Sequence, residues 1–140
     1  MKKLAPFSEM VGTSNPVINS KEFPSVKTKV NKLSNIDADT VYKYLINGIE
    51  VIEFLSPDLD IIDSKITVRT KVFTDGCYLW TMMIPHLVKN YKVSLPEEFM
   101  HYLRKQNTYA NQYDNGRIKQ ILDSLKGKKI DSYVKFSDDE

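Results

Sequence analysis

Few residues of this chain are of the types that do chemistry, and their spacing assembles no site. The only histidines are His86 and His101, and the only cysteine is Cys77. Two histidines without an acidic or thiol ligand at helical spacing are too few for a metal centre. The pattern places Cys77 on the apolar side of a hairpin, where a thiol packs as a small hydrophobe. No glycine-rich phosphate loop occurs. The sequence therefore predicts a protein that is not an enzyme and that has no metal or cofactor.

An acidic run is the first candidate for recognition. It consists of Glu50, Glu53, Asp58, Asp60 and Asp63. The spacing of two residues is seen in calcium loops, but the glycine and the terminal bidentate glutamate of an EF-hand are missing. Two interpretations stay open: a solvated loop, or an acidic face for a basic partner.

The second candidate is a hairpin between residues 66 and 81. Asp75-Gly76 favours a two-residue type I′ turn, which places Thr74 opposite Cys77. One face then carries mainly apolar residues and is expected to be the core face: Ile66, Val68, Val72, Cys77 and Leu79. The other face combines cations and aromatics: Arg69, Lys71, Phe73, Tyr78 and Trp80. Such a face can bind single-stranded nucleic acid. We favour the alternative, an aromatic cluster covered by another element, with Lys71 over Trp80.

The elements that position these residues can be predicted from hydrophobic period and capping. A helix is expected from Asp37, as its N-cap, to Asn47-Gly48, with Gly48 in the left-handed conformation. A strand over 49–55 follows it. A short strand is expected over 26–30, and a last one over 130–136.

Two helices are expected directly after the hairpin. Thr81 is the predicted cap of the first, which ends near Tyr91. Ser94-x-x-Glu97 predicts a capping box at the start of the second, which ends near Gln106. A further helix buries one stripe and stops at Gly127: Ile118, Ile121, Leu122 and Leu125.

These elements predict the α+β class, with a small, mainly antiparallel sheet around the hairpin 66–81 and three to four helices packed on it. The expected organisation is an irregular N-terminal arm over 1–35, a single α/β domain over 36–136 and a frayed acidic tail over 137–140.

A net charge of +2 neither predicts nor excludes a nucleic-acid partner. The N-terminal sequence predicts no signal peptide, and no run of about 20 apolar residues occurs. The expected location is the cytoplasm, without a membrane partner.

The chain resembles a group of small bacterial proteins in three successive segments: Thr74-Asp75-Gly76-Cys77-Tyr78-Leu79-Trp80, Val88-Lys89-Asn90-Tyr91 and Leu95-Pro96-Glu97-Glu98-Phe99. They share a TDG-aromatic-Trp hairpin and an LP-E-F helix start. The resemblance spans about residues 38–106 and extends to the helix end Tyr44-Leu45-Ile46-Asn47-Gly48. The group resembles immunity proteins of polymorphic or contact-dependent toxin systems. The segment Met82-Met83-Ile84-Pro85-His86 departs from the more polar helix start of the group.

The resemblance implies a non-catalytic inhibitor that occludes the active site of a cognate toxin domain. Its expected contact residues are the acidic run, the hairpin cations and two aromatics: Glu50, Glu53, Asp58, Asp60, Asp63, Arg69, Lys71, Tyr78 and Trp80. The alternative is a nucleic-acid-binding module. It would use the hairpin face or the basic C-terminal residues Arg117, Lys119, Lys126, Lys128 and Lys129.

Overall fold

The computed structural model describes residues 1–10, 22–106, 113–127, 130 and 132–140. The chain forms an α+β fold with a sheet in the order β2-β3-β4-β1-β5. Strand β3 (Thr67–Thr74) runs antiparallel to both β2 (Ile49–Leu59) and β4 (Tyr78–Thr81). The predicted class is confirmed. The sheet is mixed, because β1 (Lys2–Lys3) runs parallel to both β4 and β5 (Ser132–Tyr133).

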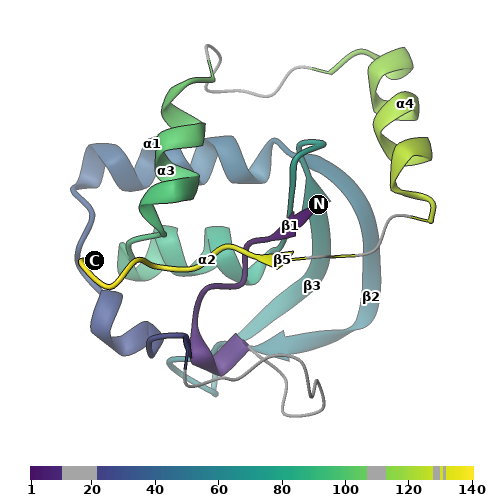
Figure 1. Ribbon diagram of the computed structural model, residues 1–140. Coiled ribbons are helices and arrows are strands. Elements are labelled where there is room, and N and C mark those ends of the chain that lie inside the picture. Colours follow the sequence, from purple (N-terminus) through teal and green to yellow (C-terminus); the bar gives the residue numbers. More distant parts are fainter. Residues whose placement is uncertain (11–21, 107–112, 128–129, 131) are drawn as a thin grey trace.

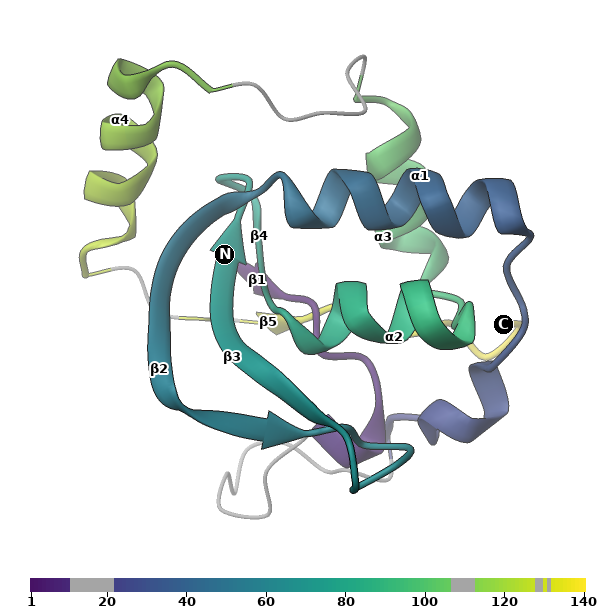
Figure 2. The same ribbon diagram turned by 180° about the vertical axis from the view of Figure 1, so that it is seen from behind.

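Helices α1 (Asn35–Ile46) and α2 (Met83–Tyr91) lie side by side, and α3 (Glu97–Arg104) crosses them (Figure 1). Helix α4 (Asn115–Leu125) stands apart from these three helices in both views, beside the hairpin (Figure 2). Tyr113, two residues before α4, lies at the hairpin tip: its hydroxyl is 3.5 Å from the carbonyl oxygen of Asp75. Strands β2 and β3 form a long, bent ribbon at the opposite edge of the sheet from β5.

Helix α1 is capped one turn earlier than the sequence predicts. The Ser34 hydroxyl, not Asp37, accepts a hydrogen bond from the backbone, at 3.1 Å from the Asp37 nitrogen. At the other end, Gly48 is not left-handed. A Cβ at Gly48 would lie 2.7 Å from the Trp80 ring. The glycine therefore serves a close approach between chain and indole.

The hairpin has a wider loop than the predicted type I′ turn. Thr74 pairs with Leu79 and Phe73 with Trp80, a shift of two residues from the predicted register. The Asp75 carboxylate causes this, because it accepts the N–H groups of both Cys77 and Tyr78, at 2.9 and 2.8 Å. A shift of two keeps each side chain on its predicted face.

Of the five residues on the predicted core face, only Val68 is buried. The aromatic face is the core face: Trp80 is fully buried, and Phe73 and Tyr78 are buried beside it. The Trp80 Nε1–H donates to the Leu45 carbonyl of α1 at 3.2 Å, so the indole has a polar partner inside the core. Cys77, predicted to be buried, is exposed. The alternative of a covered aromatic cluster is confirmed, although Lys71 pairs with acids of β2.

Neither predicted cap of the next two helices forms. The N-cap of α2 is Met82 and that of α3 is Pro96, both without a side-chain hydrogen bond. The Glu97 N–H at the start of α3 donates instead to the side chain of Glu140. The backbone carbonyl of Glu140 accepts from Lys29 Nζ at 2.7 Å. The tail predicted to fray is therefore held against the body.

Residues 1–10 and 22–35 of the predicted arm pack into the domain, and residues 11–21 lie outside the described residues. Strand β1 lies between β4 and β5, and Leu4 and Phe7 are completely buried. A 3₁₀ turn over Ser8–Met10 follows. The predicted strand over 26–30 is a 3₁₀ helix, Val26–Lys29, capped by the Ser25 hydroxyl. Of the predicted last strand over 130–136, the described residues form a strand at Ser132–Tyr133, and residue 131 lies outside the described residues.

Candidate interaction surface and an aspartate–histidine cluster

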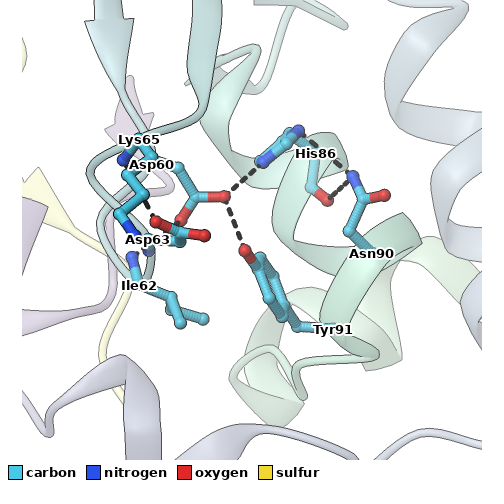
Figure 3. Close-up of polar contacts among 7 residues, drawn as sticks. All are labelled: Asp60, Ile62, Asp63, Lys65, His86, Asn90 and Tyr91. Carbon is cyan, nitrogen blue, oxygen red and sulfur yellow. Dashed lines mark hydrogen bonds and ion pairs between the residues drawn. The ribbon is translucent and has the colours of Figure 1, made fainter.

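A buried carboxylate links the loop after β2 to helix α2 (Figure 3). Asp60 is 2% exposed and accepts hydrogen bonds with both oxygens. Its Oδ2 lies 2.6 Å from His86 Nε2 and 2.9 Å from the Tyr91 hydroxyl. Its Oδ1 accepts the backbone N–H groups of Ile62 and Asp63, at 2.7 and 3.1 Å. Asp60 thus closes its own loop and ties it to two side chains of α2.

Asn90 determines the tautomer of the His86 ring. The Asn90 amide nitrogen donates to the His86 backbone carbonyl at 2.9 Å and lies 3.1 Å from His86 Nδ1. Because an amide NH₂ only donates, Nδ1 is the acceptor and the ring proton resides on Nε2. The His86 Nε2–H therefore donates to the Asp60 carboxylate.

The environment of Asp60 has opposing effects on its pKa. Burial raises the pKa, but hydrogen bonds from His86, Ile62, Asp63 and Tyr91 outweigh it, and the net pKa is lowered. The pKa of Tyr91 is raised to about 12 by burial and by its bond to the ionised Asp60. The cluster thus holds a carboxylate and a neutral phenol at neutral pH.

This geometry differs from that of a catalytic Asp-His pair. In such a pair the carboxylate orients one ring nitrogen and leaves the other free to take a proton from a nucleophile. Here Asp60 contacts Nε2 while Asn90 contacts Nδ1, so both ring nitrogens of His86 are engaged. Within the described ranges, no group of three or more His, Cys, Asp or Glu residues is placed to hold a metal ion. The cluster is a structural clamp, and the acidic run thereby loses Asp60 as a contact residue.

The most unusual surface of the molecule is strand β2. After Ile49, every residue of β2 is exposed. Its large apolar side chains include Leu55, which is completely exposed, and four others between 37 and 57% exposed: Val51, Ile52, Phe54 and Leu59. We call these five residues the apolar edge. Clustered exposed apolar residues of this kind mark interaction sites more often than scattered single ones.

The predicted acids and cations of the ribbon pair with one another. Arg69 Nη2 lies 2.7 Å from Glu53 Oε1, and Lys71 Nζ lies 3.4 Å from Glu50 Oε2. They were expected to form two separate contact surfaces. The antiparallel register instead sets Glu53 opposite Lys71, so they form one surface of mixed charge. Exposed pairs of this kind contribute little to stability.

A groove of about 470 Å³ lies beside this ribbon, between it and helices α1 and α2. Residues of all four elements line it, among them Tyr42, Glu50, Arg69, Lys71, Phe73 and His86. The groove therefore adjoins the charged side of β2, while Ile52 and Phe54 belong to the other side of the ribbon, in register with Val72 and Thr70.

The structure divides the predicted contact residues into two groups. Exposed or half-buried on the ribbon and its loop are Glu50, Glu53, Asp58, Asp63, Arg69 and Lys71. Buried are Asp60, Tyr78 and Trp80, so the expectation that the two aromatics are exposed anchors is wrong. Sequence reasoning missed the apolar edge. The sequence did contain an indication of it, because residues 49–55 carry apolar side chains toward both faces. This pattern is typical of a strand that is covered on both sides.

Comparison with known proteins adds no relative: no family model, curated protein or solved structure matches this chain. Among the residues that the structure describes, no helix has the length and apolar character needed to cross a membrane.

Proposed function

We propose that this chain is a non-catalytic protein-binding inhibitor of the immunity type, which neutralises a toxin domain by covering its active site. The observation that carries the proposal is the apolar edge of β2, with Leu55 completely exposed. Burying such side chains against a partner contributes about 1.5–3 kcal/mol for each residue that becomes fully buried. A folded protein gains nothing from exposing them without a partner.

Three further features support the proposal. The hairpin and helix motifs resemble those of immunity proteins, the one histidine–carboxylate cluster described above has a structural role, and the single cysteine suits a reducing compartment such as the cytoplasm. The nucleic-acid alternative that uses the hairpin face receives less support, and Lys128 and Lys129 of its C-terminal version lie outside the described residues. Its stacking residue Trp80 is fully buried, and its cations Arg69 and Lys71 are paired with carboxylates.

The experiment is co-expression with the product of the adjacent upstream gene, with two readouts: co-purification and rescue of growth. The variant Leu55→Asp places a charge in the apolar edge at a completely exposed position, so the fold is expected to persist. We expect this variant to retain its melting temperature and to lose about tenfold or more in affinity, since one lost anchor costs at least 1.4 kcal/mol.

The matched control is Ile36→Asp, which changes an exposed apolar residue of α1 that is 79% exposed. It is expected to bind and rescue like the unchanged chain. Absence of co-purification and of rescue with the unchanged chain would refute the proposed function. Equal losses for Leu55→Asp and Ile36→Asp would show that the interface is not at β2.

A further inference from the structure

We propose that the partner contributes an extended segment that pairs with the free edge of β2 as an added strand, and that this segment alternates basic and apolar residues. This inference rests on the proposed function and specifies how the partner is recognised.

The backbone of β2 is available for such pairing. In the described sheet β2 is the terminal strand, hydrogen-bonded on one side only, to β3. An edge strand presents a row of N–H and C=O groups that another chain can continue. Proteins usually protect long edges with short strands, inward charges or a covering element. Strand β2 has 11 residues and an exposed surface throughout after Ile49.

The register assigns the side chains of β2 to two different faces. Glu50 pairs with Phe73 and Glu53 with Lys71, which places both acids on the groove side of the ribbon. An irregularity at Val51 allows two residues three apart to share this face. Lys71 confirms the shared face, because its Nζ lies 3.4 Å from Glu50 and 3.9 Å from Glu53.

Ile52 and Phe54 lie on the opposite face, in register with Val72 and Thr70. Between Glu50 and Phe54, an added strand therefore meets carboxylates on one face and the apolar side chains of Ile52 and Phe54 on the other. Cross-strand neighbours on one face are the pairs that stabilise a sheet. A segment in which basic and apolar residues alternate can place its basic side chains beside the carboxylates and its apolar side chains beside the apolar ones.

The charge of β2 favours a basic partner over a second copy of this chain. The sequence of β2, IEVIEFLSPDL, holds three acids and no base. Self-pairing would set acidic strand against acidic strand, and like charges directly opposite are destabilising. Glu50 and Glu53 already form ion pairs with Lys71 and Arg69 of β3. A carboxylate has about four lone-pair sites, so each can also accept a hydrogen bond from a basic side chain of an added strand.

The pairing is confined to the first half of β2. A second irregularity falls between Phe54 and Asp58, and Pro57 within it has no N–H to donate. Residues 50–55 are therefore the docking stretch, a length near that of a typical strand.

The test uses two synthetic peptides of about eight residues, one alternating Lys and Val and one alternating Glu and Val. Amide NMR shifts and amide hydrogen exchange of the full chain report where each peptide binds. The Lys/Val peptide is expected to shift and protect amides within residues 50–55, and the Glu/Val peptide is expected to leave them unchanged. Exchange separates strand addition from diffuse attraction, since only paired amides gain protection.

The double variant Glu50→Lys with Glu53→Lys supplies the specificity test. Its affinity for the Lys/Val peptide is expected to fall by about twofold to fivefold for each reversed charge, and it is expected to bind the Glu/Val peptide more tightly than the Lys/Val peptide. The control is Asp37→Lys with Asp39→Lys on α1, which keeps the original preference. Circular dichroism confirms the fold of both. If the reversed chain does not fold, a titration of the unchanged chain with salt replaces it, and binding is expected to weaken as salt rises.

Three outcomes would overturn the inference: no binding of the Lys/Val peptide, binding without protection of residues 50–55, or a free chain that is already dimeric with these amides protected. Co-purification of a toxin together with any of these would leave the proposed function standing while this inference fails. Binding of the Lys/Val peptide at β2 without any toxin partner would support the inference and refute the proposed function.

Discussion

At the scale of single residues, the Asp60 cluster shows how one carboxylate organises a loop. Two backbone N–H groups, an imidazole and a phenol converge on it, and they keep its pKa below the usual 3.8 despite burial. A carboxyl with a lowered pKa in the folded state contributes stability that is complete above its unfolded pKa. This contribution is lost as the pH falls from about 3.8 through the folded pKa.

We expect Asp60→Asn to lower the free energy of unfolding at neutral pH by about 1.5–3 kcal/mol, since bonds to a charged group are replaced. The acid side of the stability profile is expected to become less steep. It does not become flat, because the pKa values of Glu9 and Glu140 are also lowered. Urea unfolding from neutral pH down to about pH 3 measures both effects. An unchanged acid slope would show that Asp60 is not ionised in the folded protein.

At the scale of elements, the hairpin tip depends on side-chain hydrogen bonds and not on a standard two-residue turn. Asp75 accepts two backbone N–H groups of the loop, and its Oδ2 accepts the Tyr44 hydroxyl of α1 at 2.7 Å. Burial and the charge of Asp75 raise the pKa of Tyr44 strongly. One carboxylate thus sets the register of the hairpin and connects it to α1.

We expect Asp75→Ala to lower the free energy of unfolding by about 1–3 kcal/mol or more, because three donors lose their acceptor at a buried position. Cys77→Ser, two residues away and exposed, is the matched control and is expected to change stability by less than about 0.5 kcal/mol. Equilibrium unfolding by urea, followed by Trp80 fluorescence, compares the two variants. Equal stability of both would mean that the loop does not need the carboxylate.

At the scale of the whole molecule, the chain ends complete the core. The first strand lies between β4 and β5, so residues from both ends of the chain meet on the sheet. Phe7 is fully buried, and its ring centroid lies 5.9 Å from that of Phe136. Residues 1–10 of the predicted arm therefore contribute to the core of the domain.

We expect Phe7→Ala to lower the free energy of unfolding by about 3–5 kcal/mol, the range for removing a buried aromatic ring. Phe54→Ala removes the same atoms from a side chain that is 53% exposed on the apolar edge, and it is expected to cost far less, about 0.5 kcal/mol. Thermal and urea unfolding of the two variants, side by side, give the comparison. Similar losses at the two positions would contradict the assignment of Phe7 to the core.

Features that depend on neighbouring residues can be predicted from the sequence alone. Hydrophobic period placed α1 to α4, β3 and β4 close to their observed bounds, and it placed the start of β2, which continues to Leu59 and not to residue 55 as predicted. Gly76 and Gly127 have the positive φ angles that their turns require. The α+β class followed from the order of these elements. The two faces of the hairpin were also separated correctly, because alternation survives a register shift of two residues.

Which hairpin face is covered depends on long-range packing, because Trp80 is buried by α1 and α3, and α1 is distant from it in the sequence. The same reason applies to the chain ends, where two-residue strands pair only with segments far along the chain. It applies to the candidate site as well. Ile52 and Phe54 have the composition of a buried strand, and their exposure depends on β2 lying at the sheet edge. Asp60 became a buried clamp because α2 brings His86 and Tyr91 to it.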